Sequence, residues 1–369
     1  MDANEKSATE QQQTTKCADI AVHTSQEIDA IGRATASGKT LAGYWVDYDV
    51  IRFSTPAIQH TVEIRLTEDE RRGGMDSSHL EAFAREQDSD AVLAQLYILS
   101  ALAPPPPAPK QAIYTGWIQF DDVIDKIGWS PRSTAERREM HARIASFLRF
   151  GERAMIVGER TTPYVNRKTK TKFDTQVSHP LWRVTEQREP AQGTLDETAS
   201  EADRAPVAVK VAITEKIAEL ITSPITAQFL PMGEVLGAIP PGRASGAWAR
   251  VIGLALMSFW RRNPEKSLNG YYQPTRRELL THFPPKVAPL NEVLASQNNA
   301  RAIEYWHDAL RALVECSILA DEGETLLKAK EVRAALPLRD WQRDWLDGRV
   351  VLMPGEEMKT HVVARALMR

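Results

Sequence analysis

Apolar residues recur at helical spacing in the stretch that follows Ser133. The four that set the pattern are Met140, Ile144, Phe147 and Leu148. They fall at positions i, i+4, i+7 and i+8, so they share one face of a helix. Arg138, Ala142 and Arg149 fall on the opposite face. The pattern predicts an amphipathic helix with its apolar face in a core and an arginine-bearing face toward solvent.

Both ends of this helix carry signals of their own. Ser133 and Glu136 form an S-x-x-E capping box, in which each side chain accepts a hydrogen bond from a backbone N–H of the first turn. Gly151 stands where a helix C-terminus favours a residue that tolerates positive φ. The helix is therefore expected to run from about residue 134 to Gly151.

Shorter elements surround this helix in a definite order. A strongly apolar helix is expected over residues 88–102, and the four prolines that follow end it, because proline cannot continue a helix. A short strand at Trp117 and a short helix come next. Strand-like runs at residues 154–156 and 181–184 follow the long helix, and a connection rich in Lys and Arg joins them. This is the order of a winged helix, a helix-turn-helix with a β-ribbon.

The segment before this module predicts a small β element. Residues 44–53 and 58–66 alternate apolar and polar positions, as half-buried strands do, and indicate a hairpin or two neighbouring strands beside the module. Residues 68–78 are charged and contain two glycines, which favours a loop. Residues 1–40 are polar and are expected to be a disordered or weakly helical tail.

The second half of the chain repeats the same order. Helices are expected over residues 243–262, 274–282 and 299–316, with a short strand at Tyr271 and Tyr272 and a small hairpin over residues 318–328. The apolar face of the third helix comprises Ala302, Trp306, Ala309, Leu310 and Leu313. A further helix is expected where Trp341 and Trp345 stand four apart.

These elements predict an α+β fold, mainly helical, with two winged-helix domains in tandem and a small N-terminal β element. The expected boundaries are a tail over residues 1–40, the first domain with its hairpin and basic wing over 41–185, an acidic polar linker over 186–206, the second domain over 207–346 and a C-terminal tail over 347–369.

Basic charge is concentrated in the first of these domains. The whole chain of 369 residues carries 46 Lys and Arg against 49 Asp and Glu. Residues 110–185 alone carry fourteen Lys and Arg against eight Asp and Glu, a surplus of six. A local positive surplus is what a phosphate-binding surface requires.

The candidate DNA-binding residues are basic side chains of the predicted long helix, the wing and the second domain. They are Arg132, Arg137, Arg138, Arg149, Arg160, Arg167, Lys168, Lys170, Lys172, Arg276, Arg277 and Arg301. The planar fork of arginine fits guanine and phosphate, and the threonines of RKTKTK add hydroxyl donors for phosphate. The alternative interpretation is a solvated helix face with i, i+4 ion pairs and an exposed loop.

The residue pattern does not indicate a catalytic or metal site. The stretch GRATASGKT resembles a phosphate-binding loop, but Arg33 stands where that motif needs its first glycine. The eight histidines include no H-x-H or H-x-x-x-H pair, and two cysteines cannot form a zinc ligand set. Six tryptophans are expected in the cores: Trp117, Trp129, Trp182, Trp248, Trp260 and Trp306. We therefore expect no enzyme activity, no cofactor and no metal.

The chain is expected to reside in the cytoplasm. Its two cysteines do not suggest a disulfide framework. No apolar run approaches the roughly 20 residues that span a bilayer, so no membrane association is expected. The first residues are polar and partly acidic, unlike a signal peptide.

The tandem layout with a basic first wing resembles the plasmid replication initiator (Rep-type) proteins of bacteria. The segments that carry the likeness span residues 88–330 and are DAVLAQLYILSAL, WIQFDDVIDKIGW, AERREMHARIASFLRF and PLWRV in the first half, with PTRRELLTHF and ARAIEYWHDALRALVECSIL in the second. The resemblance implies that both modules place a helix in the major groove of repeated origin sequences. It also implies opening of an AT-rich segment and contact with host replication proteins such as a helicase.

The second module departs from the first in charge. Its expected turn reads DEGE, and its long helix carries Glu304, Asp308 and Glu315 beside Arg301 and Arg311. Its hold on phosphate should be weaker, so it is either a weaker reader of DNA or a module for homodimerisation or partner binding. Two other functions stay open for the whole chain: a winged-helix transcription regulator, and a protein-interaction scaffold without DNA.

Overall fold

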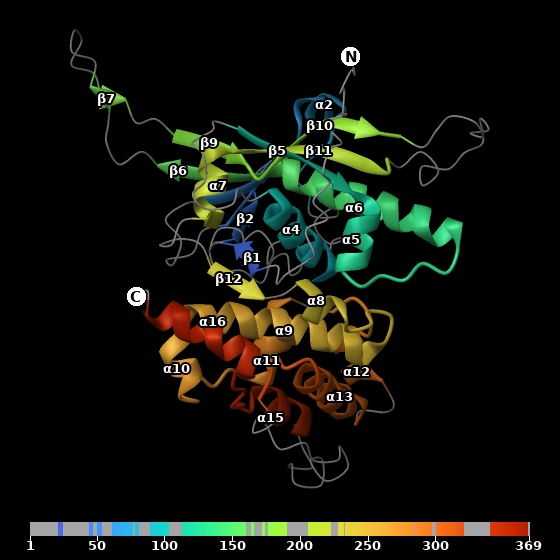
Figure 1. Cartoon of the computed structure of the whole chain (residues 1–369), viewed down its shortest axis with the longest axis vertical. Helices are drawn as coiled ribbons and strands as arrows, with labels where there is room; N and C mark the ends of the chain where they lie inside the picture. The colour runs from blue at the N-terminus through green and yellow to red at the C-terminus, as the bar shows by residue number, and fades with distance from the viewer. Residues whose placement is uncertain are drawn as a thin grey trace, which may run out of the picture.

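The computed structural model describes sixteen stretches of the chain. They are residues 21–24, 44–46, 50–53, 61–76, 78–80, 89–102, 113–159, 164–165, 172–173, 176–189, 206–222, 228–231, 233–283, 285–296, 300–320 and 340–367. The fold is α+β and mainly helical, as the sequence predicts. Figure 1 shows two units, of which the first contains the larger sheets and the second is helical. We call residues 44–222 the first unit and residues 233–367 the second unit.

A five-stranded antiparallel sheet forms one side of the first unit. Its strand order is β2-β3-β4-β6-β9, with β2 at Tyr44–Val46, β3 at Val50–Phe53, β4 at Thr61–Arg65, β6 at Ala154–Glu159 and β9 at Gln176–Pro180. Strands therefore occur in both predicted N-terminal segments, but the first segment forms two paired strands, β2 and β3, rather than one. Strand β4 pairs directly with β6, which follows the long helix. Glu63, buried on β4, accepts hydrogen bonds from Arg52 at 2.7 Å and Arg65 at 2.6 Å, which compensates the buried carboxylate.

A second antiparallel sheet has the strand order β10-β11-β5. The strands are β5 at Ile113–Gln119, β10 at Arg183–Arg188 and β11 at Ala208–Thr214. The expected second domain begins at residue 207, yet β11 lies between two strands of the first unit. The reason is burial: Val209, Val211 and Ile213 alternate toward the first core, and both edges of β11 gain hydrogen-bonded partners.

Three helices fill the core of the first unit beneath these sheets. They are α4 at Ser89–Leu102, α5 at Phe120–Lys126 and α6 at Thr134–Arg153. Each agrees with a predicted helix. A shorter helix, α7 at Glu215–Thr222, follows β11. Ile144, Phe147 and Leu148 of α6 are buried, and Met140 is partly buried against the core, so the predicted apolar face is confirmed.

The C-terminal end of α6 differs from the expectation. The helix runs through Gly151 to Arg153, so this glycine does not cap it. A Cβ atom on Gly151 would meet the Trp182 indole at 2.1 Å, and that ring is buried and donates a hydrogen bond to the Leu148 carbonyl at 2.9 Å. The glycine is needed for close approach of a large ring rather than for a left-handed turn.

A short helix occupies the first part of the loop expected over residues 68–78, and residues 73–76 are irregular as predicted. The helix α2 spans Glu68–Arg72 and begins with a complete capping box between Thr67 and Glu70. Arg153 at the end of α6 pairs with Glu70, one contact being 3.3 Å from Nε to the carboxylate. The charge that indicated a loop therefore serves the helix cap and a tertiary ion pair.

The second unit is built around two long helices packed on each other. They are α9 at Ala244–Arg262 and α13 at Arg301–Glu315, both close to their predicted bounds. All five predicted core residues of α13 are buried, which confirms its apolar face. Shorter helices surround the pair: α8 at Gly233–Gly237, α10 at Pro264–Leu268, α11 at Arg276–His282, α12 at Leu290–Ala295, α15 at Trp341–Asp347 and α16 at Glu356–Leu367.

The strands expected in the second unit are reduced to single bridges. Thr275 bridges to Arg349, and Leu319 bridges to Pro354. Tyr271 and Tyr272 lie in irregular backbone, and Tyr271 is 78% exposed. The turn and the second strand of the expected hairpin, residues 321–328, lie outside the described residues. Within the described residues, the pairing of Leu319 with Pro354 and of Thr275 with Arg349 was not predicted.

Two segments expected to be tails contribute regular structure. Residues Ala21–Thr24 form β1, which pairs antiparallel with β12 at Gln228–Pro231. At the other end, α16 buries Met358 and Val362 against the second unit. Figure 1 shows the β1–β12 ribbon between the two units. The sequence pattern did not predict these two elements, because each is stabilised by residues distant in the chain.

Candidate nucleic-acid interface

In the helix α6, the N-terminal half is exposed and the C-terminal half is packed in the core. Residues 132–139 are all exposed, while the C-terminal half of the helix is held in the core by Ile144, Phe147 and Leu148. Ser133 is the N-cap, and its side chain accepts from the backbone N–H of Glu136 at 3.1 Å. The Glu136 carboxylate accepts from the backbone of Arg132, one residue earlier than the predicted box requires. The helix therefore starts where the sequence predicts.

Arg137 is anchored by a carboxylate of the preceding helix. One guanidinium nitrogen lies 3.2 Å from Oδ1 of Asp121, and both side chains are about half exposed. The same Oδ1 lies 3.0 Å from Nε2 of buried His141. An exposed pair of this kind contributes little to stability. Its structural effect is to orient Arg137 along the α5–α6 surface.

Arg138 and Arg149 share one exposed stripe of α6. They are eleven residues apart, which is three helical turns and about 16 Å along the axis. Ala142 and Ala145 lie between them on the same stripe and are partly exposed. Both arginine side chains are exposed. The stripe therefore presents two cations separated by small side chains, and its opposite face is fixed in the core.

Arg143 of the same helix is directed inward. Its guanidinium carbon lies 4.6 Å from the ring centre of Trp129 and 5.7 Å from that of Phe147. One nitrogen lies 3.9 Å from the Asp90 carboxylate. Stacked and partly buried in this way, Arg143 belongs to the core side of the helix.

The segment predicted as the wing contains two antiparallel strand pairs among its described residues, and we call the outer pair the ribbon. After β6 and β9 pair from Met155–Pro180 to Glu159–Gln176, β7 at Tyr164–Val165 pairs with β8 at Lys172–Phe173. Lys172 is thus placed on β8, opposite Val165. Four other predicted wing residues lie outside the described residues: Arg160, Arg167, Lys168 and Lys170.

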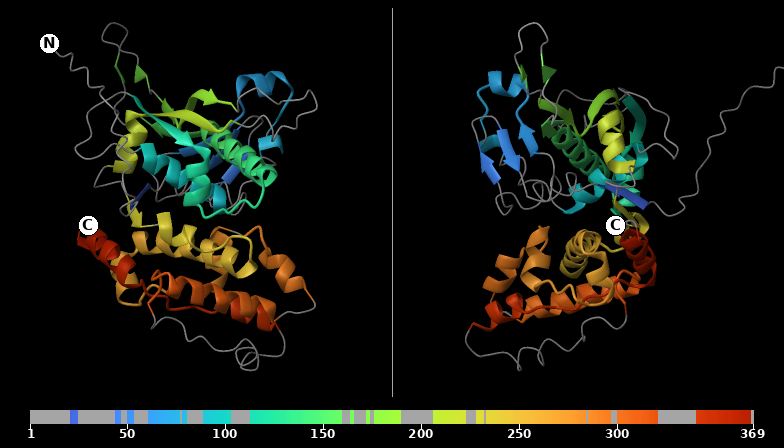
Figure 2. Two further views of the ribbon diagram at one scale, coloured as in Figure 1. Left: turned by 45° about the vertical axis from the view of Figure 1, so that its right-hand side comes forward. Right: turned by 90° about the vertical axis from the view of Figure 1, so that its left-hand side faces the viewer.

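The ribbon and the start of α6 lie at opposite ends of the first unit. Figures 1 and 2 show β7 beyond the outer end of β6, while the loop from α5 enters α6 on the other side. The 20-residue helix alone is about 30 Å long. That length is close to one turn of B-form DNA, about 34 Å. Both elements could contact the same duplex only at sites roughly one turn or more apart.

Two predicted DNA-binding residues of the second unit are engaged within the protein. Arg276 is partly buried: it donates to the Trp345 carbonyl at 3.0 Å and lies within 5.6 Å of the Trp306 and Trp345 ring centres. Arg277 is exposed and pairs with Asp347 at 2.7 Å, which lowers the pKa of that carboxyl. These contacts attach α11 to α15.

Arg301 is placed differently from these two. It is the first residue of α13, and its side chain is exposed. Arg311, two to three turns later, pairs with Asp308 at 3.0 Å on the same helix. The exposed surface of α13 is therefore mixed in charge, in contrast to the stripe on α6.

Sequence reasoning missed two basic side chains that share one face of the three-stranded sheet, Arg188 and Lys210. Arg188 of β10 lies over the Trp117 ring at 4.0 Å. Trp117, predicted to be in the core, is partly exposed, whereas the other five predicted core tryptophans are buried. Lys210 of β11 pairs with Glu186 at 2.6 Å on the same face. Because β11 and β10 come from the expected linker region and its borders, only their pairing could have brought these residues together.

Two further observations concern metal binding and membrane-spanning helices. Within the described stretches, no three His, Cys, Asp or Glu side chains gather closely enough to hold a metal ion. No helix in the described part of the chain combines the length and apolar character needed to cross a membrane.

The chain resembles two solved structures but matches no family model and no curated sequence. Both solved structures are of domains 2 and 3 of RctB, a replication initiator. The first shares 11% sequence identity over 80% of this chain and 85% of that chain, and the second 9% over 81% and 89%; each has a TM-score of 0.37. At that TM-score the likeness carries no argument about fold detail or function.

Proposed function

We propose that the chain is a sequence-specific double-stranded DNA-binding protein that acts as a plasmid replication initiator on repeated origin sites. The observation that carries the proposal is α6. Its exposed stripe bears Arg138 and Arg149, while its other face is locked in the core. A rigid helix with outward arginines is the element that reads a major groove.

The element order supports two winged-helix modules within this proposal. In the first unit, α4, β5, α5, α6, β6 and β9 follow one another in the order of a winged helix. In the second, α9, Thr275, α11, α13, Leu319 and residues 349–354 follow the same order, with strands shortened to bridges. Strand β11, which lies between β10 and β5, departs from the winged-helix order.

The second module is assigned the smaller share of DNA contact. Arg276 and Arg277 make contacts with α13 and α15. Arg301 is exposed at the first residue of α13. Within the proposal, the second unit contacts DNA through the start of α13 or serves a protein partner, a host helicase or a second copy of the chain. No nucleotide hydrolysis is assigned to either unit.

The decisive experiment is binding of duplex DNA at several salt concentrations. Replacement of Lys168, Lys170 and Lys172 by Ala should reduce the slope of log K against log salt by about 0.9 for each phosphate that the variant no longer neutralises. The matched control is Arg72→Ala, an exposed residue of α2 paired with Glu68 at 3.3 Å. Retention of the wild-type slope in the triple variant would remove the wing from the interface.

A second measurement tests the helix separately from the wing. Arg138→Ala and Arg149→Ala should each change sequence preference and weaken binding to the preferred site by about 1–3 kcal/mol if the arginine bonds to a base. An equal loss on all sequences would mean phosphate contacts alone. No retention of DNA by the wild-type chain at low salt would support the scaffold function instead.

Initiator and transcription regulator are distinguished by what happens to the DNA. An initiator bound to direct repeats should make thymines in an adjacent AT-rich tract reactive to permanganate, because the duplex opens there. A regulator bound to an operator should leave the duplex closed.

A further inference from the structure

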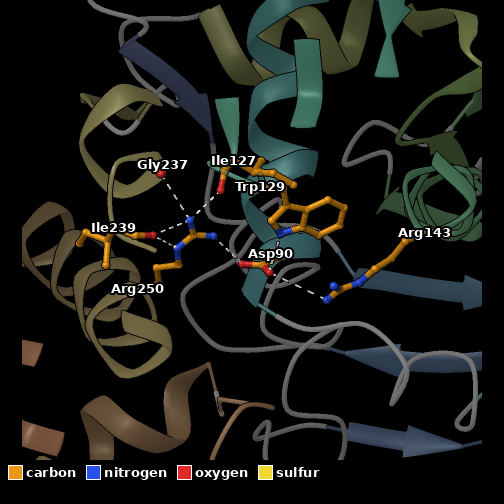
Figure 3. A network of polar contacts seen from close by, with 7 residues as sticks. All are labelled: Asp90, Ile127, Trp129, Arg143, Gly237, Ile239 and Arg250. Carbon is orange, nitrogen blue, oxygen red and sulfur yellow. Dashed lines mark hydrogen bonds and ion pairs between the residues drawn. The ribbon is translucent and has the colours of Figure 1, made fainter. Parts of the chain in front are cut away.

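A buried arginine of the second unit reaches into the first. Arg250 lies on α9 and is fully buried. Its guanidinium donates to the Ile239 carbonyl at 2.9 and 2.7 Å within its own unit, and to the Ile127 carbonyl of the α5–α6 turn at 2.7 Å. Figure 3 shows these bonds converging on one side chain. A single residue therefore holds backbone groups of both units.

The charge of this arginine is balanced by Asp90 of the first unit. Nη1 of Arg250 lies 2.8 Å from Oδ1 of Asp90, at the first turn of α4. The other carboxylate oxygen accepts from the Trp129 indole at 3.0 Å. Figure 3 shows Asp90 between Arg250 and Trp129. Because both charges are desolvated, their mutual geometry is tightly constrained.

Two glycines allow the backbones of the units to touch at the same place. A Cβ atom on Gly128 would lie 1.7 Å from the Gly237 carbonyl oxygen, and one on Gly237 would lie 2.3 Å from the Lys126 carbonyl oxygen. Gly128 also adopts a positive φ of 71°. The α5–α6 turn is thus pressed against the end of α8 with no side chain between them.

This turn leads directly into α6. Trp129 is followed five residues later by Thr134, the first residue of the helix. The Trp129 ring packs on Phe147 of α6 at 6.1 Å between centres, and Arg143 lies over it. The turn is therefore continuous with the exposed half of α6 along the chain, and its Trp129 ring packs on the buried half of the same helix.

We propose that Arg250 is a positioning residue for α6: the second unit, through this guanidinium, fixes the α5–α6 turn and with it the helix that faces DNA. The part that concerns DNA rests on the proposed function, whereas the part that concerns the turn does not. The bonds to backbone carbonyls favour positioning over bulk stability alone, since they fix the turn in space rather than fill volume.

The test uses the full chain with three variants and one control. Arg250→Lys keeps the charge but loses the planar fork, and Arg250→Met loses both. Gly237→Ala leaves Arg250 and Asp90 intact but forces the two backbones apart. The control is Arg311→Met, an exposed arginine of α13 that pairs with its neighbour Asp308.

The first readout is amide hydrogen exchange without DNA. The N–H groups of Ile127, Gly128 and Trp129, which bond to carbonyls of α5, report on the turn. We expect exchange there to rise at least tenfold in Arg250→Lys and Gly237→Ala, with β11 and α13 unchanged. A uniform rise across both units would mean that Arg250 supports stability alone, and an unchanged turn in both variants would also overturn the proposal.

The second readout is binding to the preferred duplex. We expect Arg250→Lys and Gly237→Ala to lose tenfold or more of the preference for that duplex over random DNA, while Arg311→Met keeps it. A mobile turn with full preference would overturn the link between Arg250 and DNA reading while the proposed function stands. Failure of the wild-type chain to bind any duplex would instead overturn the proposed function, and the exchange readout would still decide the role of Arg250 at the turn. Should Arg250→Met not fold, the other two variants carry the test.

Discussion

The packing of Trp182 against α6 depends on the absence of a side chain at Gly151. The indole fills the space that a side chain at Gly151 would occupy, and its hydrogen bond to the Leu148 carbonyl fixes its orientation. A glycine near the end of a helical pattern did mark a constraint on the chain, but the cause of that constraint is a tertiary contact. No local pattern could identify the distant ring.

Gly151→Ala should therefore destabilise the protein, although Ala is the better helix former by about 1 kcal/mol. Overpacking against a buried, hydrogen-bonded ring costs about 1–3 kcal/mol, which outweighs that gain or cancels it at the low end. The measurement is the urea midpoint at constant m-value. The same substitution in a Trp182→Phe background should lose most of its penalty; a raised midpoint for the single variant would contradict the packing argument.

Glu70 makes stability depend on pH at the α2–α6 contact. Burial alone would raise its pKa, but hydrogen bonds from Arg153 and from Thr67 outweigh burial and hold the pKa below its ordinary value of 4.5. At a pH between the lowered native pKa and the ordinary pKa of 4.5, the unfolded chain binds more protons at Glu70 than the native chain does. The stabilisation by Glu70 is therefore fully present above pH 4.5 and is lost as the pH falls through the native pKa.

We accordingly expect Glu70→Gln to be less stable than the wild type at neutral pH and to lose less stability between about pH 6 and 3.5. The measurement is the free energy of unfolding in urea at each pH. Glu219→Gln, which removes an exposed carboxylate of α7, controls for the change in net charge. Parallel pH curves for Glu70→Gln and the wild type would show that the ion pair with Arg153 contributes nothing.

At the scale of elements, helices were predicted well and strand partners were not. The long helices α4, α6, α9 and α13 carry their signal in their own periodicity and caps, so their bounds follow from the sequence to within a few residues. Strands carry no information about their partners, which is why β11 and the β1–β12 ribbon were not foreseen. The placement of the wing residues stays a prediction, because all of them except Lys172 lie outside the described residues.

The cap of α6 offers a test that separates helix stability from DNA contact. Ser133→Ala removes the acceptor for the Glu136 N–H and should cost about 1 kcal/mol in unfolding free energy. Ser133→Asp keeps a capping oxygen and suits the helix dipole, so stability should be retained. It also adds a negative charge beside Arg137 and Arg138.

DNA affinity should accordingly fall more in Ser133→Asp than in Ser133→Ala, in the reverse order of their stabilities. Fluorescence anisotropy with a labelled duplex, beside urea titrations of each variant, measures both quantities. Equal affinities for the two variants would place the start of α6 away from DNA.

At the scale of the whole molecule, the cores of the two units are continuous with each other. Buried apolar residues form a continuous cluster from the sheets of the first unit to the helices of the second, and Arg250 with Asp90 lies at the junction. The sequence predicted the α+β, mainly helical class. It did not predict the joint, because nothing local marks an arginine of α9 as the partner of an aspartate 160 residues away.

Heating the full chain should consequently give one transition, with far-UV circular dichroism and tryptophan fluorescence coinciding. Arg250→Met leaves Asp90 buried without its main cation, a loss of roughly 3–5 kcal/mol. We expect this variant to unfold in two separate steps. A single, merely lower transition in the variant would mean that apolar packing alone couples the units.

The position of β11 in the middle of its sheet has a consequence for synthesis of the chain on the ribosome. Strands β5 and β10 emerge first but do not pair with each other, since residues 208–214 must lie between them. The first unit therefore cannot complete its sheet until the chain is made well past residue 214. Until then the nascent protein exposes two unpaired strand edges, which makes this interval the point at which a chaperone would be most needed.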